Sequence, residues 1–108
     1  MALIRKKVTS IKWPVSITSP ADGGKWKNET YTGTFKKVGI KQIEELADKG
    51  DPQLIREVLE DWEDIKDEDG NEIPFSTEEL DLFLDDVNLI KGTVQAIIDM
   101  QKGASEKN

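Results

Sequence analysis

The order of the local signals predicts an α+β fold, in which a small N-terminal antiparallel β-sheet or hairpin is followed by a body of about four α-helices. Apolar residues alternate with polar ones early in the chain, whereas from Ile40 onward they recur at helical spacing. Strand signals first and helix signals afterwards distinguish this class from alternating α/β folds. The length of 108 residues predicts a single domain, residues 1–108.

Residues 13–38 form the predicted β part, which is basic and follows a loose N-terminal arm over residues 1–12. Alternating apolar residues from 13 to 17 predict the first strand. Pro14 places that strand at an edge of the sheet, because proline cannot donate a ladder hydrogen bond. A loop over residues 19–24 then leads into the second strand of the predicted hairpin.

The second predicted strand carries Tyr31 and Phe35 on one face, with Gly33 between them at a bend or a close backbone approach. Aromatic side chains among lysines can stack on nucleic-acid bases, but more often they form the hydrophobic face of a small sheet. We favour the sheet face for this aromatic set, which is Trp13, Trp26, Tyr31 and Phe35.

Residues 40–102 form the predicted helical part, which is acidic. A first helical segment ends at Gly50, and Asp51 then predicts an N-cap with Pro52 at the first helical position. Apolar residues at helical spacing follow as one stripe, and Trp62, the last of them, is interpreted as a core anchor. The members of this stripe are Leu54, Ile55, Val58, Leu59 and Trp62.

Two more helices are predicted in the last third of the chain. Ser76 and Glu79 form a capping box that opens the first of them, on which Leu82 points away from the apolar cluster. The last helix covers about residues 88–102, and its apolar residues spread over roughly 200° of its surface, about twice a usual core stripe. Such a face indicates either a central helix or a surface that waits for a partner, and residues 103–108 are expected to form a glycine-capped, disordered tail. The candidate partner-binding residues are Leu82, Leu89, Val94, Ile98 and Met100.

The chain contains no His and no Cys, which excludes disulfides, thiolate and imidazole metal ligands, cysteine nucleophiles and the usual general base at neutral pH. Carboxylates crowd residues 61–69, and paired carboxylates can hold Mg²⁺ or do acid–base work. We expect these groups to be exposed at a turn, and no glycine-rich phosphate loop accompanies them. The sequence therefore predicts a protein that is not an enzyme, with no catalytic residues, no metal and no cofactor.

A calcium loop around Gly70 is the one metal motif that can be tested by counting. An EF-hand loop needs oxygen ligands at positions 1, 3 and 5, Gly at position 6 and a bidentate Glu at position 12. With Gly70 at position 6, Asp67 and Asp69 fall at positions 3 and 5. Position 1, however, is Ile65 and position 12 is Ser76. Because the first ligand and the Glu are missing, we interpret the Asp-Gly-Asn sequence as a turn.

The net charge of -7 is distributed unevenly. Residues 1–41 hold nine Lys/Arg and two acidic residues, whereas residues 42–108 hold six and twenty. Parts of opposite sign favour packing within the chain or head-to-tail association between copies. We expect a homo-oligomer, formed either in this way or through the apolar face of the last helix. Solvated helix faces and lysine-guarded edge strands account for the same distribution equally well. The scattered lysines and the acidic rear part disfavour nucleic-acid binding.

The sequence gives no sign of a membrane segment or of secretion. No apolar run is long enough to span a membrane, and residues 1–7 lack the apolar segment that a signal peptide needs after its charges. The absence of Cys leaves no sign of a disulfide-built secreted domain. We therefore expect a cytosolic protein without a membrane partner.

Several short motifs follow one another in a characteristic order. They are Leu59-Glu60-Asp61-Trp62, Asp67-Glu68-Asp69-Gly70 and Pro74-Phe75-Ser76, preceded by Ser19-Pro20-Ala21-Asp22-Gly23 and a β-prone run that ends Thr34-Phe35-Lys36. The central pattern is a Leu-x-x-Trp helix end, an acidic-Gly turn, a Pro-Phe-Ser step and a helix rich in Leu and acids. In this order and spacing, over roughly residues 13–98, the chain resembles a family of phage tail assembly chaperones.

Members of that family are made in the infected bacterium, bind the tape-measure protein, help tail-tube subunits gather on it and leave before the tail is complete. The resemblance thus implies the tape-measure protein and the tail-tube protein as partners, and the cytoplasm of the bacterial host as the location. The residues themselves leave a second class open, an acidic nucleic-acid mimic or small inhibitor of a basic DNA-binding protein. In that class the carboxylates of the rear part would imitate phosphates.

Overall fold

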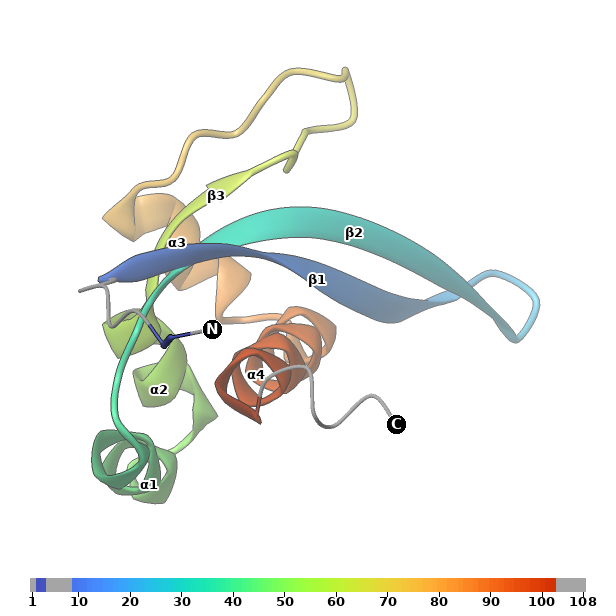
Figure 1. Ribbon diagram of the computed structural model, residues 1–108. Coiled ribbons are helices and arrows are strands. Elements are labelled where there is room, and N and C mark those ends of the chain that lie inside the picture. The colour runs from blue at the N-terminus through green and yellow to red at the C-terminus, as the bar shows by residue number, and fades with distance from the viewer. Residues whose placement is uncertain (1, 4–8, 103–108) are drawn as a thin grey trace.

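The computed structural model describes residues 2–3 and 9–102 and has the predicted α+β class. Within these residues, three antiparallel strands form one sheet in the order β1-β2-β3, and four helices accompany it (Figure 1). The third strand lies between two helices, so the expected order of a hairpin followed only by helices is wrong at that point. The elements are β1 (Ser10–Ala21), β2 (Lys25–Lys36), α1 (Ile40–Asp48), α2 (Asp51–Val58), β3 (Leu59–Glu63), α3 (Thr77–Phe83) and α4 (Val87–Lys102).

The hairpin of β1 and β2 is longer than the sequence predicts. The two strands pair over their whole lengths, and Gly23 and Gly24 both have positive φ in the turn that joins them. The expected loop over residues 19–24 is therefore reduced to a tight turn. Residues 10–12, which were expected in a loose arm, belong to β1, while residues 1 and 4–8 lie outside the described residues.

Two side-chain contacts reach from the first residues of β1 across the sheet to β3. The Ser10 hydroxyl donates a hydrogen bond to the Glu60 carboxylate, and the Lys12 ammonium forms an ion pair with Glu63, so β1 is joined to β3 across the intervening strand. The hydrogen bond to Glu63, together with the charge of that carboxylate, raises the pKa of Lys12. Both contacts are exposed and contribute little to stability, but they join the basic front of the chain to its acidic rear.

Trp62 lies on β3, which corrects the predicted helical stripe. The helix α2 ends one residue before Leu59, whose φ of -81° and ψ of 116° are extended. Adjacent residues of β2 pair with Leu59 and Asp61, so Glu60 is the extra residue of a β-bulge. The bulge turns Leu59 and Trp62 to the same side of the sheet and buries both, although they are three residues apart.

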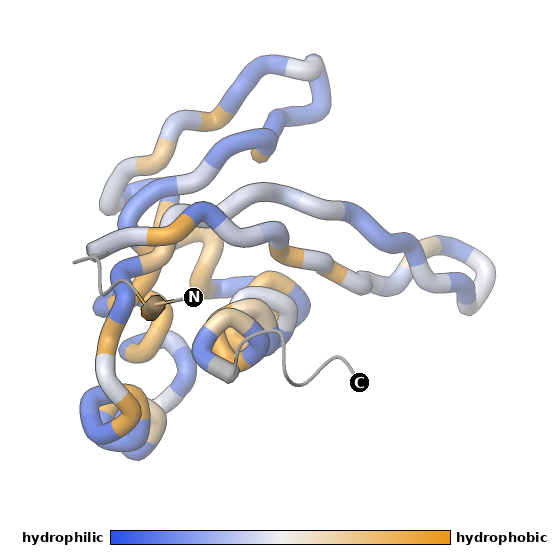
Figure 2. Tube along the Cα trace, viewed as in Figure 1, coloured by the Kyte–Doolittle hydropathy of each residue, from blue (hydrophilic) through white to orange (hydrophobic). Residues whose placement is uncertain are grey.

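The helices α1, α2 and α4 lie on one side of the sheet, and the far end of the β1–β2 hairpin extends beyond them (Figure 1). The axis of α4 comes close to β1 at Gly92, where an added Cβ would stand 2.5 Å from the Ser16 carbonyl oxygen and 2.5 Å from Ile17 Cδ1. Only glycine permits this approach. Hydrophobic residues gather on the helices and on the strand segments that face them, whereas the hairpin end is mostly hydrophilic (Figure 2).

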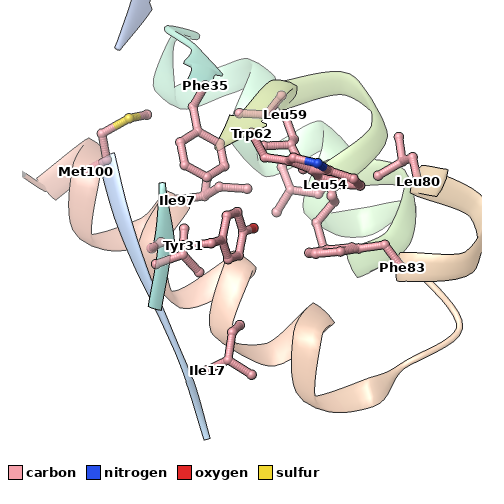
Figure 3. Close-up of a cluster of buried hydrophobic side chains, with 14 of the residues drawn as sticks. Ile17, Tyr31, Phe35, Leu54, Leu59, Trp62, Leu80, Phe83, Ile97 and Met100 are labelled. Carbon is pink, nitrogen blue, oxygen red and sulfur yellow. The ribbon is translucent and has the colours of Figure 1, made fainter. Parts of the chain in front are cut away.

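The core lies between the sheet and the helices and is rich in aromatic contacts (Figure 3). The Trp62 ring stacks on Phe83 with centroids 5.1 Å apart and meets the edge of Phe75 at 4.9 Å. Its indole N–H donates a 2.8 Å hydrogen bond to the carbonyl of Ile73. Trp62 is therefore a core anchor, as the sequence predicts.

The close approach expected at Gly33 is also confirmed, since a Cβ there would lie 2.7 Å from the Phe35 ring.

The helix starts agree with the sequence to within a residue. The Ser76 hydroxyl accepts a 3.1 Å hydrogen bond from the Glu79 amide, which confirms the predicted cap of α3. Gly50, rather than Asp51, occupies the N-cap position of α2, so Asp51 and Pro52 are its first two residues. The glycine cap and tail expected over residues 103–108 lie outside the described residues.

Candidate functional site

The wide apolar face of α4 divides into a covered half and an outer half. Ala96, Ile97 and Met100 are buried in the core, together with the polar Thr93. The Thr93 hydroxyl shares a 2.7 Å hydrogen bond with the Tyr31 hydroxyl. Burial raises the pKa of Tyr31 to about 12, although the hydrogen bond to Thr93 opposes the shift. This half of the face fits the first alternative from the sequence, in which the helix is central to the fold.

The outer half of the same face is partly exposed. Val87, Ile90, Val94 and Ile98 follow one another at steps of three or four residues, so at about 100° per residue they lie within an arc of about 80°. Val87 is 61% exposed and Ile98 is 37% exposed, while the two residues between them are half-buried against the core. We call these four residues the outer stripe of α4. A continuous apolar stripe at helical spacing is the usual way in which a helix is presented to a helical partner.

The structure separates the five candidate partner-binding residues. Val94 and Ile98 belong to the outer stripe, whereas Met100 is buried in the core and offers no exposed edge. Leu89 is half-buried on the side of α4 that faces the hairpin. Leu82 is 69% exposed, as the sequence predicts, but it lies on α3. Helical spacing indicates how wide the apolar face is, but not which edge the sheet covers, so Val87 and Ile90 are not among the residues predicted from the sequence.

A cavity of about 360 Å³ lies between the hairpin and the loop that follows β3. Its apolar lining includes Tyr31, Phe83 and Leu89, and its rim carries the carboxylates of Asp64 and Asp67. The volume is within the range of small-molecule sites. Its lining also includes Glu29, Thr30 and Lys66, and the chain supplies no His or Cys to it. The cavity lies between the loop and the neighbouring part of β2.

The acidic turn after β3 is held by its own side chain. Asp67 Oδ1 accepts hydrogen bonds from the backbone amides of Asp69 at 2.9 Å and of Asn71 at 3.0 Å, and Gly70 has a φ of 84°. This is the Asx-type turn that the Asp-Gly-Asn sequence predicts. Across residues 2–3 and 9–102, no three His, Cys, Asp or Glu side chains are grouped so that they could hold a metal ion.

No helix within the described part of the chain is both long and apolar enough to cross a membrane. Comparison with known proteins adds no relative. No family model matches the chain, and no curated protein or solved structure is significantly similar to it.

Proposed function

We propose that this protein is a phage tail assembly chaperone. In this proposal it acts in the cytoplasm of the bacterial host, binds the tape-measure protein before the tail tube forms and helps to recruit tail-tube subunits to it. Two independent observations support the proposal: the family resemblance of the motifs between residues 59 and 76, and the outer stripe of α4. The stripe is the observation that carries it, because it provides a surface suited to the partner.

The chemistry of the stripe matches a long helical partner. Tape-measure proteins are long and helical, and helical partners are held by apolar residues that recur at helical spacing. Val87 and Ile98, the two most exposed members of the stripe, stand eleven residues apart on one face of α4, which is about three helical turns. A partner helix laid along α4 would cover the half-buried residues between them. The acidic rear of the chain would keep such a complex soluble.

Leu82 would extend the same function from a second helix. It is the most exposed large apolar residue of α3, and it is separated along the chain from Val87 only by the short link between α3 and α4. If a tape-measure helix contacts both α3 and α4, Leu82→Glu should weaken its binding, as changes in the outer stripe should. Unchanged binding of Leu82→Glu would confine the surface to α4.

Co-expression with the tape-measure protein of the same phage tests the proposal. We expect the tape-measure protein to become soluble with this chain, to aggregate without it, and to elute with it as one complex in gel filtration. Because apolar contacts dominate, the complex should persist at high salt. If the tape-measure protein is equally insoluble with and without this chain, the proposal fails.

The same preparation distinguishes the acidic-mimic class. A mimic of nucleic acid would bind a basic DNA-binding protein through carboxylates, and its affinity would fall steeply as salt rises. Binding to such a protein together with no binding to the tape-measure protein would replace the chaperone function by the mimic function.

A further inference from the structure

The outer edge of β1 is closed to strand addition by its own sequence. The Lys37 amide donates to the Thr9 carbonyl at 2.9 Å, which continues the β1–β2 register and fixes its phase. In an antiparallel ladder, hydrogen-bonded pairs alternate with non-bonded pairs. The backbone N–H and C=O groups of the odd-numbered residues therefore point from each strand of the hairpin towards the other. The even-numbered residues of β1 therefore direct their amides outward, and two of them, Pro14 and Pro20, have no amide hydrogen.

The opposite edge of the hairpin is open over half of its length. By the same alternation, the even-numbered residues of β2 direct their backbone groups away from β1. The strand β3 pairs with β2 only from Thr32 to Phe35. The outward backbone groups of Trp26, Asn28 and Thr30 therefore lie beyond the end of β3, and no hydrogen bond reaches them from elsewhere in residues 2–3 and 9–102. Such an edge is a template for another strand.

The loop that follows β3, residues 64–72, forms no backbone hydrogen bond with this edge. Asp64 has a φ of 67°, which turns the chain at the end of β3, and Lys66 and Glu72 then pair with each other in a separate small hairpin. Residues 64–67 and the pair Glu29 and Thr30 line the same cavity, so an open space lies between the loop and this end of the edge. The distal part of β2 extends past this loop (Figure 1).

The charges along the open edge are self-complementary in one register. When two copies of this edge pair antiparallel, residues whose backbone groups point outward must lie opposite each other. The two-fold axis then lies between the strands, beside a residue that faces its own copy. An axis at Lys27 sets lysine against lysine, and an axis at Glu29 sets glutamate against glutamate. With the axis at Asn28, Lys27 of each copy faces Glu29 of the other, and Trp26 pairs with Thr30. Only this register uses all three outward residues and pairs opposite charges twice.

We propose that the distal edge of β2 is an interface between two copies of this chain, which join antiparallel about Asn28. The two distal hairpins then form a four-stranded sheet, and β3 of each copy keeps its pairing with the proximal part of its own β2. The occupant of the edge is thus a second copy, selected by the Lys27–Glu29 complementarity. Within a single copy these two side chains form only an exposed contact of 3.7 Å. The dimer is independent of the tape-measure function, because the outer stripe of α4 does not belong to this edge.

Charge exchange tests the register directly. Lys27→Glu alone and Glu29→Lys alone each place like charges opposite each other twice, so each should raise the dimer dissociation constant by about tenfold or more. The double variant, with Lys27→Glu and Glu29→Lys, has the same composition as the natural chain and should dimerise as it does. An equimolar mixture of the two single variants should form the heterodimer. Sedimentation velocity measures dimerisation of the natural chain, the two single variants, the double variant and the mixture. Melting temperatures confirm that each variant is folded.

Amide exchange then locates the interface. In the dimer, the amides of Trp26, Asn28 and Thr30 should be protected, and in the single variants they should exchange rapidly, while the amides of Lys27 and Glu29 stay protected by β1 in every form. A natural chain that stays monomeric at high concentration overturns the proposal. So does a dimer that both single variants retain, or a dimer that leaves the three outward amides unprotected.

Discussion

Tyr31 shows how far a single residue can be read from the sequence. Tyr31 and Phe35 lie four residues apart in a strand, which correctly predicts one shared face of the hairpin. That face is buried, and Tyr31 is only 4% exposed. Its polar partner could not be found in the same way, because Thr93 lies sixty-two residues away and reaches Tyr31 only through the docking of α4 on the sheet. A threonine on an apolar helix face indicates a buried hydrogen bond only when the opposing surface is known.

Tyr31 should make stability depend on alkaline pH. Because burial raises the pKa of the folded phenol to about 12, above the ordinary value of 10.0, the unfolded state loses this proton first. The contribution of Tyr31 to the free energy of unfolding is complete below pH 10.0 and is lost as the pH rises towards about 12. The loss in the free energy of unfolding is on the order of 2 kcal/mol. Since Tyr31 is the only tyrosine, absorbance of the phenolate reports it alone, and urea unfolding gives the loss. Tyr31→Phe is the control, and a phenol that titrates near pH 10 in the folded protein would contradict the expectation.

Trp62 should be the most costly aromatic residue to truncate. It stacks on Phe83, meets Phe75 edge-on and donates to the Ile73 carbonyl, so Trp62→Ala removes packing and leaves that carbonyl without its donor. The expected loss in the free energy of unfolding is about 3–5 kcal/mol. Trp26→Ala is the matched control at concentrations at which the chain is monomeric, because the Trp26 side chain is then 66% exposed. Equal effects of the two changes in chemical denaturation would contradict the role of Trp62 as a core anchor.

At the scale of elements, β3 is where local spacing was misleading. The apolar residues from Leu54 to Trp62 fit a helical stripe, and α2 does use the first part of that stripe. The bulge at Glu60 then gives Leu59 and Trp62 a separation of three residues on the same face, the spacing that a helix would give. Because the bulge depends on pairing with β2, which is distant in sequence, periodicity alone could not distinguish the two structures.

The contact between α4 and β1 should depend on Gly92. Alanine favours a helix interior by about 1 kcal/mol over glycine, but its Cβ would stand 2.5 Å from the backbone oxygen of Ser16. Because that neighbour is backbone, α4 must shift from the sheet, and Gly92→Ala should destabilise the protein despite its better helix propensity. Gly39→Ala is the control for steric contact, since no atom lies within 4 Å of the added Cβ. Any loss of stability there comes from the weaker N-cap of α1 and not from displaced neighbours. A stabilising Gly92→Ala in urea unfolding would contradict this packing.

At the scale of the whole molecule, the fold class and the separation of a basic front from an acidic rear could be predicted from the sequence. The strand order, the third strand and the exposed edge of α4 could not, because each depends on which distant surface covers which face. Met100 illustrates the point: its position on α4 suits a binding face and a core face equally well, and the docking of the helix buried it. The width of the apolar face was the usable signal.

The most direct test of the chaperone function and of the outer stripe compares how strongly variants of exposed residues bind the tape-measure protein. Ile98→Glu and Val87→Glu place a charge at either end of the outer stripe without entering the core, and each should weaken binding by about tenfold or more. Gln42→Glu adds the same negative charge at an exposed position of α1 and should leave the affinity unchanged. The amount of co-expressed tape-measure protein that elutes with each folded variant in gel filtration gives the comparison. If both stripe variants bind as tightly as Gln42→Glu, the outer stripe of α4 is not the surface that holds the tape-measure protein.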